Sequence, residues 1–308
     1  MTSISQSLTV VIPTIGRPEL GRAVDSVRQQ GDENVRIVIV ADLDPSDPRA
    51  NAVQNLPYDV DVIYTGGGVK AARARNLGVH AARSQWVSFL DDDDYWLPRK
   101  LETQIEAAER TGSTVLACRV AQVRATDLVM VAPSVPHRLL PESVAPAEYL
   151  FRKRRPGAGR ASLFTSTLMV DTALAREVPW DESLTRHQDW DWVIRLSDHP
   201  AFAMYHCPEV LTHIVVGSEG SISAGSDWQA SLDWAARLLE DRDSKVFVDF
   251  VSAQTLRYAL QSRSWDGVRA CARAIARAKT MPSAGPLVIG AAGIVSRRGI
   301  ERAMRVIH

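Results

Sequence analysis

The chain has 308 residues, of which 45% are apolar and 23% are charged, and its formal net charge is +0 at pH 7. This composition can build a sizeable core, and it excludes a disordered chain, a collagen-like chain and a minimal disulfide scaffold. Because 36 Lys and Arg balance 36 Asp and Glu, no overall field would draw the protein onto nucleic acid.

The first part of the chain alternates short, nearly continuous apolar runs with segments of helical spacing. This pattern is typical of parallel strands that are covered on both faces, so the sequence predicts an open α/β sheet. The predicted strands are Leu8–Pro13, Val35–Ala41, Val60–Tyr64 and Trp86–Leu90, and the crossover segments are Glu19–Gln30, Ala50–Asn55 and Lys70–Ala82.

The second part predicts more strands and helices and then a helical region. The expected strands are Val115–Val123, Leu163–Val170, Ala201–Cys207 and Val210–Val216, and the expected helices are Leu97–Arg110, Thr172–Glu177, Asp189–Leu196, Trp228–Asp241, Val246–Gln261 and Trp265–Lys279. The prolines between Pro133 and Pro156 favour a long irregular connection. The Gly/Ser-rich segment 217–225 predicts a boundary near residue 225, with a domain over 1–225 and a helical region over 226–308.

Cellular location is predicted from what the sequence lacks. The start, Met1–Gln6, has neither a basic region nor an apolar run, and the weakly polar stretch Pro286–Val295 is about half of the roughly 20 residues that a spanning helix needs. Cys118, Cys207 and Cys271 have no zinc or redox spacing and are expected to be reduced. These features predict a cytoplasmic protein.

Polar, small and acidic residues lie at the end of each of the first four predicted strands. They are Pro13 and Thr14, then Asp42, then the run 65–68 (Thr-Gly-Gly-Gly), and finally the four aspartates 91–94. Because ligands bind beyond the carboxyl ends of parallel strands, these groups are expected to converge on one edge of the sheet.

Four consecutive aspartates need compensation, because each like-charged neighbour raises the pKa of the next. A hard divalent cation such as Mg²⁺ or Mn²⁺ would supply it and would also bind substrate phosphates. The alternative is a solvated acidic turn before a helix that has Pro98 near its first turn. The position at a strand's carboxyl end favours the metal site.

A second group of carboxylates lies at Asp189 and Asp191. On a helix they are about 200° apart, so they cannot share a face. Asp191 is spaced to pair with Arg195, which leaves Asp189 as the better general base; the alternative is a plain helix cap. His213 lies in an apolar run and has two interpretations, a core or edge histidine and a metal ligand.

The glycine run 65–68 lets a ligand approach the backbone, and Lys70, Arg73 and Arg75 follow it. Such groups suit a diphosphate, although a solvated helix face gives the same pattern. The dinucleotide motif G-x-G-x-x-G does not follow the first strand, and the phosphate-loop motif G-x-x-x-x-G-K-[ST] is absent from the chain. The hypotheses of a dinucleotide-binding site and of a phosphate-binding loop therefore lose their main support.

Taken together, the motifs resemble, in order, those of the inverting family 2 glycosyltransferases, which have the nucleotide-diphospho-sugar transferase (GT-A) fold. The resemblance spans residues 8–223 and rests on five segments: Val10–Thr14, Val40–Asp42, Ala74–Gly78, Phe89–Asp94 and Gln188–Leu196. It implies a mixed, mostly parallel sheet between helices, with a nucleotide-sugar half over about 1–125, an acceptor half over about 126–225 and a helical C-terminal extension.

The resemblance also implies a role for individual residues. Asp189 would be the catalytic base, Asp93 would hold a Mn²⁺ or Mg²⁺ ion with His213 as a further candidate, and the acceptor candidates are Thr165, Ser166, Trp190 and Asp191. The nucleotide site would comprise Pro13, Thr14, Asp42, Gly67, Arg75, Asp91 and Asp92. Two positions depart from the family: 42–45 read Asp-Leu-Asp-Pro where Asp-Asp-Gly-Ser is usual, and Gln188 stands where a glutamate is usual.

The implied reaction is inverting transfer of a sugar from a nucleoside diphosphate sugar, with UDP-sugars favoured, to a carbohydrate, a lipid-linked or a small-molecule acceptor. The alternatives are a sugar nucleotidyltransferase and a non-catalytic sugar-nucleotide-binding member. From Arg257 onward ten basic residues stand against two acidic ones. This surface is interpreted either as a peripheral contact with the inner face of a membrane or as a solvated helix face.

Overall fold

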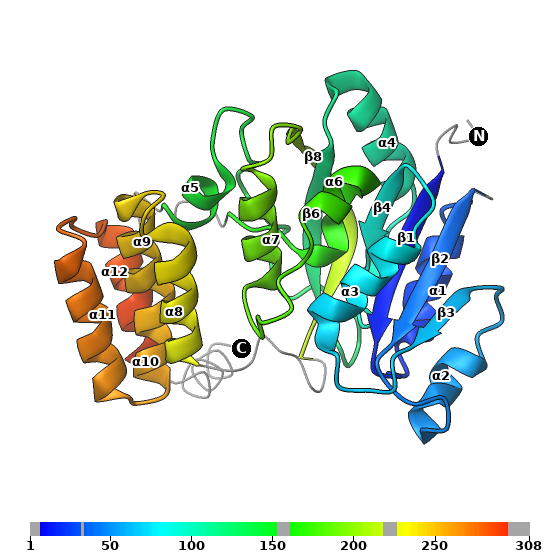
Figure 1. Ribbon diagram of the computed structural model, residues 1–308, viewed down its shortest axis with the longest axis horizontal. Helices are drawn as coiled ribbons and strands as arrows, with labels where there is room; N and C mark the ends of the chain where they lie inside the picture. The colour runs from blue at the N-terminus through cyan, green and yellow to red at the C-terminus, as the bar shows by residue number, and fades with distance from the viewer. Residues whose placement is uncertain (1–6, 32–33, 153–160, 218–226, 295–308) are drawn as a thin grey trace. The chain divides into compact units, whose positions relative to one another are not determined.

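The computed structural model describes residues 7–31, 34–152, 161–217 and 227–294 (Figure 1). The chain divides into two compact units. The first comprises Met1–Ala145 and Ala161–Ser221, and the second comprises Pro146–Arg160 and Ile222–His308.

The first unit is built on one eight-stranded sheet with the order β3-β2-β1-β4-β7-β6-β8-β5. The strands are β1 Leu8–Thr14, β2 Val35–Ala41, β3 Asp61–Tyr64, β4 Trp86–Phe89, β5 Tyr95–Trp96, β6 Val115–Arg124, β7 Met169–Asp171 and β8 Met204–Val216. β7 runs antiparallel to both of its neighbours and β5 runs antiparallel to β8, while the other pairings are parallel. The sheet is therefore mixed and mostly parallel, as the sequence predicts.

Helices cover both faces of this sheet because the strands are apolar on both faces. They are α1 Leu20–Arg28, α2 Asn51–Gln54, α3 Lys70–Ala81, α4 Lys100–Thr111, α6 Thr172–Glu177 and α7 Gln188–Leu196. Leu8, Val10 and Ile12 of β1 share one buried cluster with residues of α1 and α4. On the opposite face, Gly78 of α3 lies so close to Val11 that an added Cβ would be 2.3 Å from a Val11 methyl group.

Two predicted strands have different bounds in the structure. The run Leu163–Val170 was expected to be a strand throughout, but residues 165–167 form a 3₁₀ turn and only Met169–Asp171 pairs as β7. The predicted strands 201–207 and 210–216 merge into one strand, β8, which begins only at Met204 and whose register with β6 shifts beside Cys118 and Arg119. This irregularity bends the ladder without ending the strand.

The second unit is helical. It contains α5 Pro146–Phe151, α8 Trp228–Leu239, α9 Ser244–Phe250, a π-helical turn Val251–Thr255, α10 Leu256–Gln261, α11 Trp265–Arg277, α12 Ala284–Ala291 and a 3₁₀ turn Ala292–Ile294. Phe151, Trp234 and Phe250 pack edge to face within it. None of the helices among the described residues is long and apolar enough to cross a membrane.

Candidate active site

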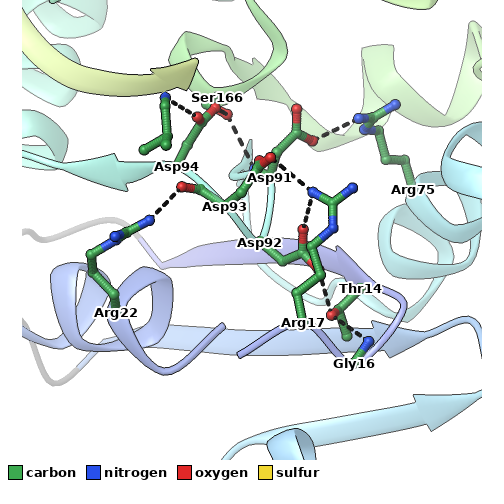
Figure 2. A network of polar contacts seen from close by, with 11 residues as sticks. Thr14, Gly16, Arg17, Arg22, Arg75, Asp91, Asp92, Asp93, Asp94 and Ser166 are labelled. Carbon is green, nitrogen blue, oxygen red and sulfur yellow. Dashed lines mark hydrogen bonds and ion pairs between the residues drawn. The ribbon is translucent and has the colours of Figure 1, made fainter. Parts of the chain in front are cut away.

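The four aspartates follow β4 at the carboxyl edge of the sheet, and each is held by different groups (Figure 2). Asp92 accepts a hydrogen bond of 2.6 Å from the Thr14 hydroxyl at the end of β1. Asp93 pairs with Arg17 at 2.8 Å, and its backbone carbonyl accepts a bond from Arg22. The predicted convergence of strand ends is therefore present at this edge.

Burial changes the acidity of two of these carboxyls. The pKa of Asp92 is raised to about 6, mainly because burial disfavours the charged form, although the bond from Thr14 opposes the rise. Asp94 is also buried, and burial together with the charges of Asp91 and Asp93 raises its pKa well above the usual value. Ser166 donates to Asp94 at 2.6 Å, and the Val215 backbone N–H donates at 2.9 Å. Asp94 thus ties the acidic run to the 3₁₀ turn at 165–167 and to β8.

Arg75 connects the acidic run to the start of α7. Its buried guanidinium donates to Asp91 at 2.7 Å and to the side-chain oxygen of Gln188 at 2.8 Å. It also lies over the ring of Trp180, 4.8 Å from the centroid. The aspartate keeps a side-chain exposure of 35%, so it remains open to a ligand. Gln188 therefore makes the contact to Arg75 at the position where the family usually has a glutamate.

Asp189 lies in the first turn of α7, close to this arginine. Its pKa is raised to about 6, first by burial, while the Trp190 backbone N–H and Arg75 lower it and Asp91 raises it. The Trp190 N–H donates to the carboxylate at 2.9 Å. A carboxyl with this pKa is largely deprotonated at neutral pH and is a stronger base than an exposed aspartate.

The loop after β3 is organised by Asp42. This carboxylate accepts bonds from the Thr65 hydroxyl at 2.7 Å and from the backbone N–H groups of Val69 and Lys70 at 2.9 and 2.8 Å. The glycines at 66–68 all have positive φ, with Gly67 at +100°, a conformation that other residues rarely adopt. The loop and the N-terminus of α3 are therefore ordered around Asp42, while Gly67 itself is exposed.

The remaining predicted site residues lie on β8, in the turn at 165–167 and on α7. His213 of β8 bonds to the Tyr95 hydroxyl at 2.7 Å, and burial lowers its pKa. Thr165 and Ser166 are buried. Trp190 stacks on His187. Asp191 is buried and pairs with Arg195 at 2.7 Å, so the predicted i, i+4 ion pair is confirmed.

Sequence reasoning missed Arg17 as a residue of this site. It is buried to four-fifths, and it contacts both Asp92 and Asp93. The signal that could have found it is position, because a single arginine follows directly on the carboxyl end of the first strand, beside Thr14.

The donor set suits a cation that arrives with phosphates. Among the described residues, no three histidine, cysteine, aspartate or glutamate side chains are placed to hold one metal ion. Mg²⁺ is usually bound by one or two carboxylates, with waters and substrate phosphates completing the shell. Asp93 and the partly exposed Asp91 fit the role of such carboxylate ligands. In this structure Asp93 pairs with Arg17 and Asp91 pairs with Arg75.

Comparison with known proteins identifies the family. A sequence profile described as glycosyl transferase family 2 matches residues 9–163, about half of the chain. The chain belongs to glycosyl transferase family 2. This membership supports a glycosyltransferase rather than a nucleotidyltransferase.

Individual relatives agree with this assignment. The amylovoran biosynthesis glycosyltransferase AmsB of Erwinia amylovora is 27% identical over 272 residues, which cover 84% of this chain and 86% of the relative. The GalNAc(5)-diNAcBac-PP-undecaprenol beta-1,3-glucosyltransferase of Campylobacter jejuni is 35% identical over 106 residues, or 33% of this chain and 34% of the relative.

A solved structure confirms the GT-A fold of the enzyme. Residues 1–349 of S. aureus TarS, in complex with UDP-GlcNAc, superpose with a TM-score of 0.64 at 14% sequence identity, and the match covers 88% of this chain and 80% of that TarS chain.

Proposed function

We propose that the enzyme transfers a sugar from a nucleoside diphosphate sugar, with a UDP-sugar favoured, to an acceptor hydroxyl with inversion at the anomeric carbon. The observation that carries this proposal is Asp189, a carboxyl whose pKa is about 6, beside the Arg75–Asp91 pair at the carboxyl edge of the sheet. A base and a nucleotide-binding edge within one site suit direct displacement of a nucleoside diphosphate.

For the donor, we assign the nucleotide to the groups around the strand ends. Pro13, Thr14 and Asp42 would border the base, and Gly67 would let it approach the backbone. Arg75, Asp91 and Asp92 would lie near the ribose and phosphates, where a guanidinium suits the charge of a diphosphate. The TarS complexes with UDP and UDP-GlcNAc support a uridine nucleotide.

For the cation, Asp93 is the proposed carboxylate ligand, with His213 as a second candidate. A bound Mn²⁺ or Mg²⁺ supplies positive charge that stabilises the departing diphosphate. Asp189 accepts the proton of the acceptor hydroxyl while that oxygen attacks the anomeric carbon. Arg75 stabilises the charged form of Asp189 and therefore keeps the base unprotonated near neutral pH.

For the acceptor, we propose a growing glycan of the cell envelope, carried on a lipid. The names of the two relatives support this choice, because one acts in amylovoran biosynthesis and the other on an undecaprenol-linked glycan. The acceptor would meet the enzyme around Trp190, because the side chains of Thr165 and Ser166 are buried. Contact with the lipid surface would use the basic face of α11, where Arg269 and Arg277 are exposed but pair with Asp266 and Glu240.

The test is calorimetric titration with UDP, dTDP and GDP, each with Mn²⁺ and with chelator, followed by transfer assays with sugars of the nucleotide that binds. We expect metal-dependent binding of UDP, loss of that binding in Asp93→Ala, and retained binding without transfer in Asp189→Asn. Binding that is unchanged in Asp93→Ala would remove Asp93 from the metal site. Sedimentation with anionic vesicles tests the lipid contact separately.

A further inference from the structure

Arg17 is the one cation in Figure 2 that reaches two of the aspartates at once. Its Nη1 lies 2.8 Å from Oδ2 of Asp93 and 3.3 Å from Oδ1 of Asp92. The side-chain exposure is 19% for Arg17 and 14% for Asp93, so water screens this pair only partly. The mechanism proposed above assigns no role to this arginine.

The turn that carries Arg17 is built to place it there. Thr14 accepts a bond from the Gly16 backbone N–H at 2.9 Å and donates to Asp92. Gly16 has a φ of +79°, and an added Cβ would lie 2.5 Å from the backbone oxygen of Arg49. The close approach and the left-handed backbone both require glycine, so the turn positions the guanidinium over the acidic run.

A guanidinium at this point competes with a metal ion. Arginine remains charged at any physiological pH, and Nη1 of Arg17 donates to Oδ2 of Asp93. A small hard cation needs carboxylate oxygens at about 2.0–2.1 Å, and two positive charges so close together repel each other strongly in a partly buried site. The arginine must therefore leave Asp93 when a cation binds there.

We propose that Arg17 is an internal counter-cation, which holds Asp93 while the site is empty and yields it only when a nucleoside diphosphate arrives with the divalent ion. This inference rests on the proposed function. The diphosphate supplies oxygens that accept the released guanidinium, so nucleotide and metal strengthen each other's binding through Arg17. Such coupling is reciprocal, because each ligand must raise the affinity of the other by the same factor.

The competing explanation is that Arg17 only braces the loop. A brace stabilises the acidic run in every state, so its removal would weaken the binding of metal. A counter-cation has the opposite signature, because its removal strengthens the binding of metal alone. The sign of the change therefore separates the two explanations.

The experiment measures free Mn²⁺ by electron paramagnetic resonance, with and without UDP, in the full chain. In Arg17→Gln we expect Mn²⁺ alone to bind roughly tenfold more tightly, and the enhancement by UDP to shrink by a similar factor. Arg17→Lys keeps the charge and is expected to stay close to the unchanged protein. Arg124→Gln is the matched control, because it removes the same charge from an exposed pair with Asp127, and it should change neither affinity.

Two outcomes would overturn the inference in distinguishable ways. If UDP promotes Mn²⁺ binding in the unchanged protein, but Mn²⁺ alone binds Arg17→Gln no more tightly, the counter-cation role is wrong and the proposed function stands. If the unchanged protein binds no Mn²⁺ with UDP, dTDP or GDP, the metal in the proposed function fails together with the inference. Circular dichroism of each variant checks that it is folded, and Arg17→Met, which also removes the charge, keeps the test open if Arg17→Gln is not.

Discussion

Replacing Asp189 by asparagine is expected to stop sugar transfer and, at the same time, to stabilise the protein. Burial raises the pKa of this carboxyl from 3.8 to about 6, so its charged form costs folding free energy at neutral pH. A shift of this size corresponds to about 3 kcal/mol, and partial exposure of the residue reduces it to about 2 kcal/mol through solvent screening. Asparagine keeps the side chain's shape and removes the charge.

The gain in unfolding free energy of Asp189→Asn must depend on pH. A carboxyl with a raised pKa in the folded state contributes stability below about pH 3.8 and loses it as the pH rises to about 6. The difference in unfolding free energy between Asp189→Asn and the unchanged protein should therefore reach its full value of about 2 kcal/mol above pH 6 and fall to zero below pH 4. Urea unfolding at pH 4, 5 and 7 measures it, with near-ultraviolet circular dichroism of the stacked Trp180–Trp192 pair as a probe of the first unit.

The matched control is Asp191→Asn on the same helix. Asp191 is buried and paired with Arg195, whose side chain is 26% exposed, so its replacement weakens a charged hydrogen bond to a partly buried guanidinium and should destabilise the protein by about 1–3 kcal/mol. If Asp189→Asn destabilises at pH 7, or its gain does not change between pH 4 and 7, burial is not what sets the acidity of Asp189.

Three further changes test the same site. The kcat/KM for the donor should rise with pH to half of its plateau at about pH 6, because Asp189 must be deprotonated to accept a proton; a pH profile flat from 5 to 8 would contradict this assignment. Arg75→Gln should lower transfer at least tenfold while the protein stays folded, since Asp91 loses its partner; activity close to normal would show that this pair is dispensable. Gly78→Ala should destabilise by about 1–3 kcal/mol, because the new methyl group meets Val11, and an unchanged urea midpoint would refute that contact.

The strands and helices that lead to the carboxyl edge of the sheet could be predicted closely from the sequence. The runs at Leu8–Pro13 and Val35–Ala41 lie in the centre of the sheet and are apolar on both faces, so periodicity alone locates them. The first became β1 with one residue added, and the second became β2 with the same bounds. The prediction is strongest where burial is continuous and the flanking turns are polar.

Other elements could not be predicted because their signal lies outside the local sequence. β5 has two residues and exists through its pairing with β8, and no periodicity can reveal so short a strand. The apolar run at 163–170 resembles a strand, yet Thr165–Thr167 form a 3₁₀ turn. The Ser166 hydroxyl in this turn donates a hydrogen bond to Asp94. A local pattern was overridden there by contacts with a distant segment.

The pairing of side chains within the site could not be predicted from the local sequence either. The residue types and the positions of the strand ends predict which groups gather, because parallel strands end on one edge. Partners cannot be predicted in this way: that Gln188 accepts from Arg75, or that Arg17 sits on Asp93, depends on side-chain directions set by α7 and by the turn after β1.

The aspartates at 91–94 are held by residues from distant parts of the chain, which limits how this enzyme can be recombined or engineered. Its support comes from both halves of the first unit: Thr14 and Arg75 precede residue 125, whereas Ser166 and Val215 follow it. The sheet is interleaved in the same way, because β6 lies between β7 and β8. The halves are therefore not exchangeable cassettes, and a chimaera joined near residue 125 would have to inherit a matching pair of partners for Asp94. New donor or acceptor specificity is better sought by changing loops within one intact parent.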